Sequence, residues 1–347
     1  MKKPLVVLSV ILTFIGLVIS APQAAPQKKP RVLRCATYQT ASNPIGKATI
    51  WWAEQVEKKT GGKIKIEVSL SEALGKAKDH YQMVKTGAVD IAVTSTSYTP
   101  GMFPVCDFPT LPFLYTVNTD FVPVWLEMLK EEALKKEYDK IGKITAVFCL
   151  PVYGLGFVKE KVLTAERLKG LRIRSTGGLQ QRLIEEWGGV PILMSPPDSY
   201  LALQRGQMDA VLTPPNVARS YKWDDYIKYY CDISTGSGST QSLMNWQVWN
   251  SLDKETQQII DGLVEESSMM SARGQIEQGN QVLDSWKKTG TVEVYTIPKA
   301  EEDKLAVGAR KVVSDWIKEL AAKGIPIQEF MRSLKASMEK HGQKWPY

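Results

Sequence analysis

Arg174 is the residue whose type and position in this sequence best suit ligand chemistry. Residues 171–174 alternate apolar and basic side chains, which predicts a short strand, and an apolar helical spacing begins at Leu179. Arg174 therefore stands where a strand gives way to a helix, the place where open α/β sheets bind ligands. The start of a helix offers unpaired N–H groups to an anion, and a guanidinium is a permanently charged fork that matches a carboxylate. We predict that Arg174 binds the carboxylate of a small organic acid; the alternative is a solvated arginine on the surface.

The histidines argue against catalysis and against a metal centre. His80 and His341 are the only two in the chain. They are too few for a Ser-His-Asp or Cys-His arrangement, and neither has an acidic cluster beside it that would complete a metal site. The sequence also lacks the GxSxG, HExxH, P-loop and GxGxxG motifs. We therefore expect no enzymatic activity, no metal and no cofactor.

The overall composition indicates a globular protein with two lobes. The chain has 347 residues, 44% of them hydrophobic and 23% charged, and this length exceeds one ordinary core. The formal net charge is +7, but the lysines are scattered, which suits an anionic small ligand better than a nucleic acid. The cysteines have no metal-ligand spacing, and their pairing cannot be deduced from the sequence. They are Cys35, Cys106, Cys149 and Cys231.

The N-terminus has the pattern of a secretory signal peptide. Lys2 and Lys3 precede an apolar run over residues 5–20, and small residues follow from Ala21. We predict a signal peptide over residues 1–25 and export to the periplasm, with the cleavage point left open. A membrane anchor is the alternative, but the run is slightly short for a span and no second such run follows.

Residues 32–94 predict the beginning of a parallel sheet. Apolar patterns indicate strands over 32–38, 63–70 and 89–94, separated by a helix that Pro44 opens and a helix over 76–85. This β-α-β-α-β order is typical of a mostly parallel sheet with helices on both faces. The predicted fold class is therefore α/β.

The same order of elements recurs in a second segment. Its expected strands and helices cover residues 172–175, 179–187, 190–194, 200–205 and 209–212. Both segments contain the pattern Tyr-x5-Gly-x2-Asp-x3-Thr at a helix-to-strand junction, beginning at Tyr81 and at Tyr200. We predict two similar lobes in which Asp90 and Asp209 hold the turns; shared turn chemistry without similar lobes is the alternative.

Long extended and helical segments are expected to join the lobes. Two extended runs over residues 144–158 and 234–249 suit a hinge, and a helical pattern from 254 to about 288 could brace both lobes or belong to a C-terminal bundle. The predicted division is 32–155 plus 244–283 for the first lobe and 156–243 plus 284–347 for the second.

The order and spacing of several motifs resemble the solute-binding proteins of tripartite ATP-independent periplasmic (TRAP) transporters, of the dicarboxylate-binding DctP type. The motifs lie at residues 52–62, 100–104, 111–114, 168–174, 197–209, 245 and 249–252. The resemblance implies a two-lobed periplasmic binding protein fold of type II-like topology, with two crossing strands as hinge and a long bracing helix. It also implies capture of a ligand by lobe closure and delivery to a membrane permease driven by an ion gradient.

The resemblance also implies roles for individual residues. In the family, the arginine that ends the strand of the 168–174 motif binds the substrate carboxylate, and here that residue is Arg174. Thr213 stands where the family often has asparagine, and its hydroxyl can still accept or donate a hydrogen bond. Asn216 lies three residues further on, and both residues are predicted to add hydrogen bonds to the ligand. Val158 stands where some members carry a second arginine. This difference favours a monocarboxylate, with an apolar or aromatic body, over a dianion.

Six further residues are weaker candidates for ligand contacts. Hydroxyl groups follow the last strand of the first lobe, and aromatic side chains lie at strand ends or on the crossing segments, where they suit ligand walls. Ordinary loop or core packing is the alternative for each. They are Ser95, Thr96, Tyr38, Tyr98, Phe157 and Trp246.

The sequence is compatible with three functions. The first is an exported binding protein that captures a small organic acid without catalysis and passes it to TRAP permease subunits. The second is a periplasmic enzyme acting on a carboxylate, which the scarcity of histidine disfavours. The third is a ligand-sensing module of a receptor, since one fold can report occupancy as well as deliver cargo.

Overall fold

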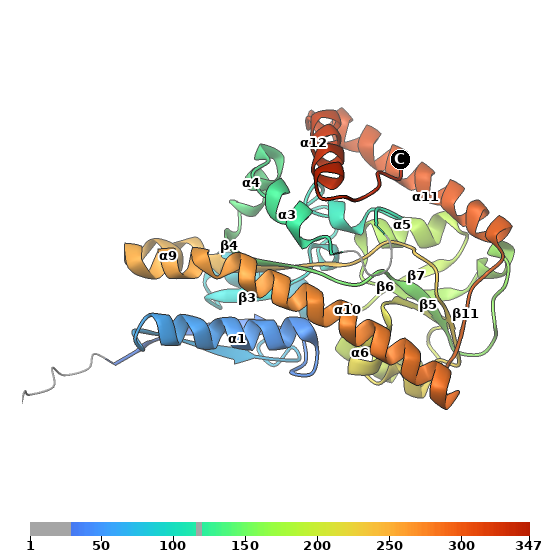
Figure 1. Ribbon diagram of the computed structural model, residues 1–347, viewed down its shortest axis with the longest axis horizontal. Coiled ribbons are helices and arrows are strands. Elements are labelled where there is room, and N and C mark those ends of the chain that lie inside the picture. The colour runs from blue at the N-terminus through green and yellow to red at the C-terminus, as the bar shows by residue number, and fades with distance from the viewer. Residues whose placement is uncertain (1–28, 116–119) are drawn as a thin grey trace, which may run out of the picture.

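The computed structural model describes residues 29–115 and 120–347, and it contains two β-sheets, each covered by helices (Figure 1). The predicted signal peptide over residues 1–25 lies outside the described residues. We call the body around the five-stranded sheet lobe 1 and the body around the six-stranded sheet lobe 2. The α/β fold class predicted from the element order is confirmed.

Lobe 1 is built on a sheet with the strand order β2-β1-β3-β10-β4. Strands β1, β2 and β3 are parallel, whereas β10 runs antiparallel to β3 and β4. The strands are β1 (Arg31–Thr37), β2 (Ile64–Ser69), β3 (Ile91–Thr94), β4 (Gly142–Cys149) and β10 (Ser239–Asn245). The helices before β10 are α1 (Pro44–Lys59), η1 (Ala77–Asp79), α2 (His80–Thr86), η2 (Thr96–Tyr98), η3 (Phe108–Thr110), α3 (Val122–Met128) and α4 (Glu132–Tyr138).

Lobe 2 is built on a sheet with the strand order β11-β9-β5-β8-β6-β7. Strands β7, β6 and β8 are parallel, and β5 runs antiparallel to β8 and β9. The strands are β5 (Gly154–Phe157), β6 (Arg172–Ser175), β7 (Val190–Leu193), β8 (Ala210–Thr213), β9 (Tyr229–Cys231) and β11 (Glu293–Tyr295). The helices before β9 are η4 (Ala165–Leu168), α5 (Gly178–Glu186), α6 (Pro196–Gln204), α7 (Pro215–Ser220) and η5 (Trp223–Asp225).

The repeated Gly-x2-Asp pattern has the same geometry in both lobes. A carboxylate oxygen of Asp90 accepts a hydrogen bond from the Arg34 backbone N–H at 2.7 Å, and Asp209 accepts the equivalent bond from Arg172 at 2.9 Å. Both aspartates therefore hold a turn against the strand that begins the repeated unit of their lobe, β1 or β6, as predicted. The tyrosines that begin the pattern differ, because Tyr81 is buried and donates to Gln241, whereas Tyr200 is only half-buried.

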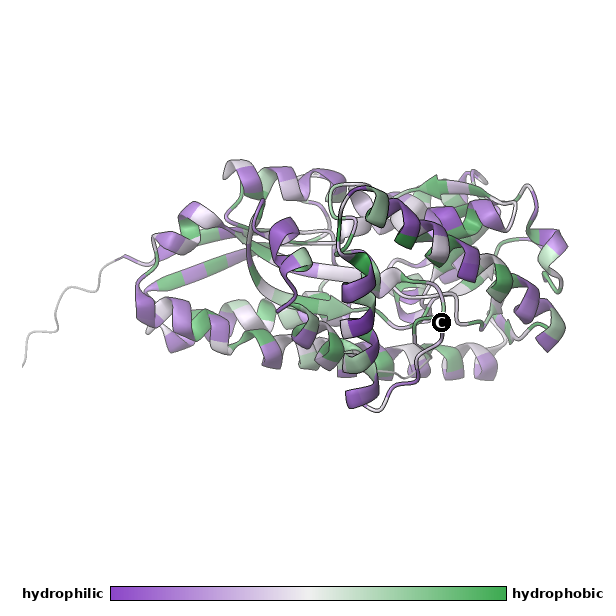
Figure 2. Ribbon diagram, turned by 90° about the horizontal axis from the view of Figure 1, so that it is seen from above, coloured by the Kyte–Doolittle hydropathy of each residue, from purple (hydrophilic) through white to green (hydrophobic). Residues whose placement is uncertain are grey.

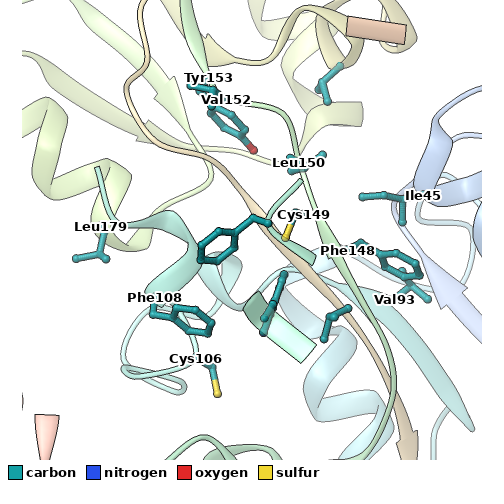
Figure 3. Close-up of a cluster of buried hydrophobic side chains, with 14 of the residues drawn as sticks. Ile45, Val93, Cys106, Phe108, Phe148, Cys149, Leu150, Val152, Tyr153 and Leu179 are labelled. Atoms are coloured by element: carbon teal, nitrogen blue, oxygen red, sulfur yellow. The ribbon is translucent and has the colours of Figure 1, made fainter. Parts of the chain in front are cut away.

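Two links connect the sheets. The first joins β4 to β5 through Leu150–Tyr153, and Figure 3 shows Leu150, Val152 and Tyr153 following Cys149 along it. The second precedes β10, and the two links are hydrogen-bonded to each other, with the Tyr153 N–H donating to the Gly236 carbonyl at 2.8 Å. The extended run predicted over 144–158 is thus interrupted, since Pro151 supplies no N–H for continued strand pairing.

The helix α10 (Val264–Thr289) contacts elements of both lobes. Figure 1 shows it running from the side of α1 and β4 to the side of β11. The predicted helix over 254–288 is divided at Leu263, which separates α9 (Lys254–Gly262) from α10. Figure 2 shows purple and green bands alternating along the outer helices, as expected of helices that bury one face. The remaining helices are α8 (Trp246–Asn250), α11 (Lys299–Ala322) and α12 (Ile327–Lys340).

The structure shows the state of the cysteines and whether its helices are suited to span a membrane. All four cysteines are buried and none forms a disulfide. Over residues 29–115 and 120–347, no helix combines the length and apolar character that crossing a bilayer requires.

Candidate ligand-binding site

Arg174 lies on β6 and its side chain is buried, with 1% of the residue exposed. Its Nε donates to the Met194 carbonyl at 2.9 Å and its Nη1 to the Leu212 carbonyl at 3.5 Å, both in lobe 2. The guanidinium lies 4.9 Å from the ring centre of Trp223, in a cation–π contact. Arg174 is therefore not a solvated surface residue, and its charge is placed by the fold.

The charge of Arg174 has no acidic partner within the described residues. Its remaining hydrogen bond goes from Nη2 to the hydroxyl of Tyr98 at 3.3 Å. A buried cation without a counter-ion is costly, and two carbonyls, a phenol and an indole ring offset that cost only in part. Since Nε is committed to Met194, the Nη1 and Nη2 groups are the ones that can receive an anion.

Arg174 lines a small cavity between the two lobes. Lobe 1 contributes strand-end and η2 residues, lobe 2 contributes residues of β6, α6 and α7 with their flanks, and the first link contributes two. The lining residues are Tyr38, Gln39, Ser95, Tyr98, Leu150, Tyr153, Arg174, Thr176, Pro196, Val217 and Tyr221. The cavity has a volume of ≈ 10 Å³, room for about one water molecule. The lobes are thus closed on each other.

The cavity is rich in neutral phenols. Burial raises the pKa of Tyr38 to about 12 and raises the pKa values of Tyr98, Tyr153 and Tyr221 as well. All four hydroxyls therefore stay protonated at neutral pH and act as hydrogen-bond donors or acceptors without charge. No aspartate or glutamate is among the lining residues, so Arg174 provides the one formal charge of this cavity wall.

Several polar contacts join the lobes around the cavity. The Tyr221 hydroxyl donates to the Tyr38 carbonyl at 2.9 Å, and the Leu179 N–H at the start of α5 donates to the Asp107 carboxylate at 3.4 Å. At the surface, Lys76 Nζ lies 2.6 Å from an Asp198 carboxylate oxygen. These contacts all span the two lobes and stabilise the closed arrangement.

Four of the predicted site residues come together at the cavity: Arg174, Tyr38, Tyr98 and Ser95. The rings of Tyr38 and Tyr98 pack edge to face with centres 5.2 Å apart. Thr96 does not join them. Its hydroxyl donates to Asp107 at 3.1 Å, because the turn of η2 directs it away from Arg174.

The structure also corrects the placement of Thr213 and Asn216. The Thr213 hydroxyl donates to the Pro214 carbonyl at 3.2 Å, and the residue is fully buried at the end of β8. The Asn216 side chain donates to Gln275 of α10. Neither residue lines the cavity, because α7 begins at Pro215 and turns these polar groups towards α10 and the sheet interior.

The two aromatic candidates on the crossing segments lie elsewhere too. Phe157 is buried in β5, paired with Ala210 and Tyr229 inside the lobe 2 sheet. Trp246 begins α8 at the far end of β10, where its indole N–H donates to the Asp139 carbonyl at 2.8 Å. Both therefore serve packing within a lobe rather than the cavity.

Sequence reasoning missed Tyr153, Tyr221 and Trp223. Tyr153 and Phe157 both lie in the extended run predicted to cross between the lobes. An aromatic residue on that run was therefore a usable signal, but Phe157 was chosen as the candidate. Tyr221 and Trp223 follow α7 in a turn where Lys222 adopts φ 58°, and nothing in the local pattern marks them as neighbours of Arg174. They contribute to the site because the tertiary fold brings the turn after α7 next to Arg174 of β6.

Larger depressions elsewhere lack these features. One of ≈ 290 Å³ is lined by Asp107, Arg182 and Trp316 among others, but Arg182 there is paired with Glu319 at 2.6 Å. Over the residues that the structure describes, no three His, Cys, Asp or Glu side chains gather as a metal site would require. The Arg174 cavity is therefore the best-supported ligand site despite its small volume.

The sequence matches the model of a protein family, Bacterial extracellular solute-binding protein, family 7 (DctP), over residues 35–320. The chain belongs to this family. It is a DctP-type solute-binding protein of the TRAP transporter class, as its motifs suggested. At the level of the family, its members are periplasmic or extracellular transport components and not enzymes.

Individual relatives of this DctP-type protein are distant in sequence, but the alignments cover most of both chains. The C4-dicarboxylate-binding periplasmic protein of Rhodobacter capsulatus is 24% identical over 83% of this chain and 86% of its own. A TRAP solute-binding protein from Rhodoferax ferrireducens, solved with copurified benzoate, superposes with a TM-score of 0.83 at 22% identity, over 90% of this chain and 98% of its own. One from Bordetella bronchiseptica, solved with bound mandelate, gives 0.82 at 21% identity, over 90% and 99%. These likenesses confirm the two-lobed fold.

Proposed function

We propose that this protein captures a small organic monocarboxylate, with an aromatic or apolar body, in the cavity at Arg174 and delivers it to a TRAP permease. The observation that carries the proposal is a buried arginine with no acidic partner in the described residues, set among four neutral tyrosines. A carboxylate would neutralise the charge and accept the free N–H groups, which makes binding favourable in this dry setting.

The charge count favours a monoanion. The cavity wall carries one cation, and Val158 stands where some family members carry a second arginine. In lobe 1 the strand position equivalent to Arg174 is Ala36, which cannot bind a second acid group. A dicarboxylate would therefore leave one charge buried without a partner.

The tyrosines favour an aromatic or apolar body. Tyr38, Tyr98, Tyr153 and Tyr221 supply flat apolar faces, and Leu150 and Val217 add aliphatic surface. Two proteins of the same fold were solved with benzoate and with mandelate, which are aromatic monocarboxylates. Benzoate and mandelate were bound by those two proteins. For this protein they are suitable test ligands of the proposed chemical class.

Ligand entry requires the lobes to separate. A cavity of ≈ 10 Å³ is far smaller than any aromatic acid, so the tyrosines and the lobes must move apart before binding. The bodies proposed to move are lobe 1 and lobe 2 as the two sheets define them. The division predicted from the sequence, 32–155 plus 244–283 and 156–243 plus 284–347, needs correction at two strands, because β10 belongs wholly to the lobe 1 sheet and β5 wholly to the lobe 2 sheet. Export through the signal peptide at residues 1–25 would place the protein in the periplasm, where it meets the permease.

The proposal is tested by substituting Arg174 with alanine. We expect native mass spectrometry of the wild-type protein to show a copurifying organic acid, and calorimetry to show benzoate binding that Arg174→Ala weakens by at least about 100-fold. Arg182→Ala is the matched control, since Arg182 lies on the neighbouring helix α5 and is already paired with Glu319. Wild-type affinity in the Arg174 variant, or a copurifying ligand without an acid group, would contradict the proposal.

A further inference from the structure

Tyr98 is a lobe 1 residue that reaches the guanidinium of lobe 2. It ends the short helix η2, where the Ser95 hydroxyl accepts a hydrogen bond from the Ser97 N–H and holds the turn. The Tyr98 side chain is buried, and its hydroxyl accepts the hydrogen bond from Arg174 Nη2 at 3.3 Å. The other hydrogen-bond acceptors of Arg174, the carbonyls of Met194 and Leu212, belong to lobe 2.

The Tyr98 hydroxyl has a hydrogen that it can turn towards a bound carboxylate. Within the part of the chain that the structure describes, this oxygen has Arg174 as its partner at hydrogen-bonding distance and angle, and in that bond it is the acceptor. Its neighbour is the Tyr38 hydroxyl, a neutral acceptor that is also bonded to Thr240 at 3.0 Å, and a negatively charged carboxylate is a stronger acceptor than this phenol. Burial raises the pKa of Tyr98 well above its ordinary value, so the proton remains on the phenol at neutral pH.

A ligand can drive closure only if it interacts more favourably with the closed form than with the open form. Contacts between a carboxylate and Arg174 form equally in both, because the groups that hold Arg174 move with lobe 2. A donor on lobe 1 that reaches the same carboxylate exists only when the lobes are together. Tyr98 meets this requirement, because its hydroxyl belongs to lobe 1 and contacts the Arg174 guanidinium in the closed form.

We propose that Tyr98 is the closing contact of this protein: its O–H donates to the carboxylate that Arg174 holds, so that one acid group is bound from both lobes. The inference rests on the proposed function and adds to it a positioning residue that couples recognition of the acid to closure. The ring of Tyr98 also lines the cavity, but the hydroxyl, and not the ring, provides the coupling.

The test compares Tyr98→Phe with Tyr138→Phe, using benzoate as the probe. Both substitutions remove one hydroxyl and keep the ring of a buried lobe 1 tyrosine, but Tyr138 lies on α4 and does not line the cavity. We expect Tyr98→Phe to weaken benzoate binding by about 10- to 100-fold, mainly through faster release, because a hydrogen bond to a charged group is lost. Tyr138→Phe should bind benzoate as the wild type does.

A second measurement reports closure itself. Small-angle scattering at saturating benzoate should show a smaller radius of gyration on binding in the wild type and in Tyr138→Phe, and a reduced change in Tyr98→Phe. Thermal unfolding checks that each variant is folded. If Tyr98→Phe binds and closes like the wild type while Arg174→Ala does not bind, this inference is wrong and the proposed function stands. If the wild-type protein itself binds no carboxylate, the proposed function is the one that fails.

Discussion

The two lobes share a framework and differ at the position that matters for binding. In each lobe an aspartate accepts a hydrogen bond from an arginine backbone N–H on the strand that begins the repeated unit, Asp90 from Arg34 of β1 and Asp209 from Arg172 of β6. Two residues further along, Ala36 pairs with Ala92 in lobe 1, and Arg174 pairs with Val211 in lobe 2. The same position thus holds a methyl group in one lobe and a guanidinium in the other.

This asymmetry explains how the protein can close over a single acid group. Two facing cations would repel each other across a closed, poorly solvated cavity. With the charge confined to lobe 2 and neutral phenols opposite it on lobe 1, the lobes meet without repulsion, as the Arg174–Tyr98 contact shows. Lobe 2 therefore supplies the charge, and lobe 1 supplies neutral donors and ring faces.

The largest expected effect comes from substituting each of the two arginines of β6 in turn and comparing the variants. We expect Arg174→Met to abolish benzoate binding while leaving the melting temperature equal to or above that of the wild type, because an apolar side chain replaces a buried cation without an acidic partner. Arg172→Met should lower the melting temperature and leave benzoate binding unchanged, since Arg172 bonds to Asp209 and lies outside the cavity. Calorimetry and thermal unfolding of both variants check this; a strongly destabilised Arg174→Met would mean that the arginine is structural.

A smaller effect is expected from the aspartates that hold the repeated turns. Asp209→Asn loses the charge that pairs with Arg172 at 2.8 Å. Asp90→Asn keeps its backbone acceptor, and Asp90 forms no ion pair within the described residues. We expect Asp209→Asn to lower the free energy of unfolding by about 1 kcal/mol at pH 7 and Asp90→Asn to change it less. Urea unfolding measures both, and equal effects would contradict the comparison.

The pH dependence of that loss follows from the lowered pKa of Asp209. Hydrogen bonding to Arg172 is the main cause of the lowering. A depressed carboxyl pKa stabilises the folded protein above the ordinary aspartate range and ceases to do so as the pH falls through the folded value. The stability difference between wild type and Asp209→Asn should therefore be full at pH 7 and shrink in acid. A difference that stays constant down to pH 3 would show that the ion pair is not its source.

The smallest effect is expected at the surface ion pair across the cleft. Lys76 meets Asp198 of lobe 2, whereas Lys63 meets Glu255 at 3.0 Å without spanning the cavity. We expect Lys76→Ala to speed benzoate release by about two- to fivefold at low salt, with the difference fading at high salt, because exposed pairs are weak and screened. Lys63→Ala should leave release unchanged. Stopped-flow tryptophan fluorescence at two salt concentrations distinguishes the variants.

Local patterns predicted the elements better than they predicted the site. Alternation over residues 171–174 and the spacing from Leu179 correctly indicated β6 and α5, and therefore the place of Arg174 at a strand end. The same kind of pattern missed the break between α9 and α10 at Leu263, since both sides of it have helical spacing. Thr213 and Asn216 were misplaced because a turn between β8 and α7 decides which way a side chain points.

Residue patterns along the chain were enough to predict the two α/β units, the turn aspartates, the family, and an arginine at a strand end without a second arginine at position 158. Tertiary structure alone decided that Arg174 is buried, that no described acid pairs with it, and that Tyr98, Tyr153 and Tyr221 gather around it. The physical reason is that strand and helix periodicity is set by neighbours along the chain. The cavity, in contrast, is made by residues that meet only when two lobes close, and a charge's surroundings depend on every segment that packs against it.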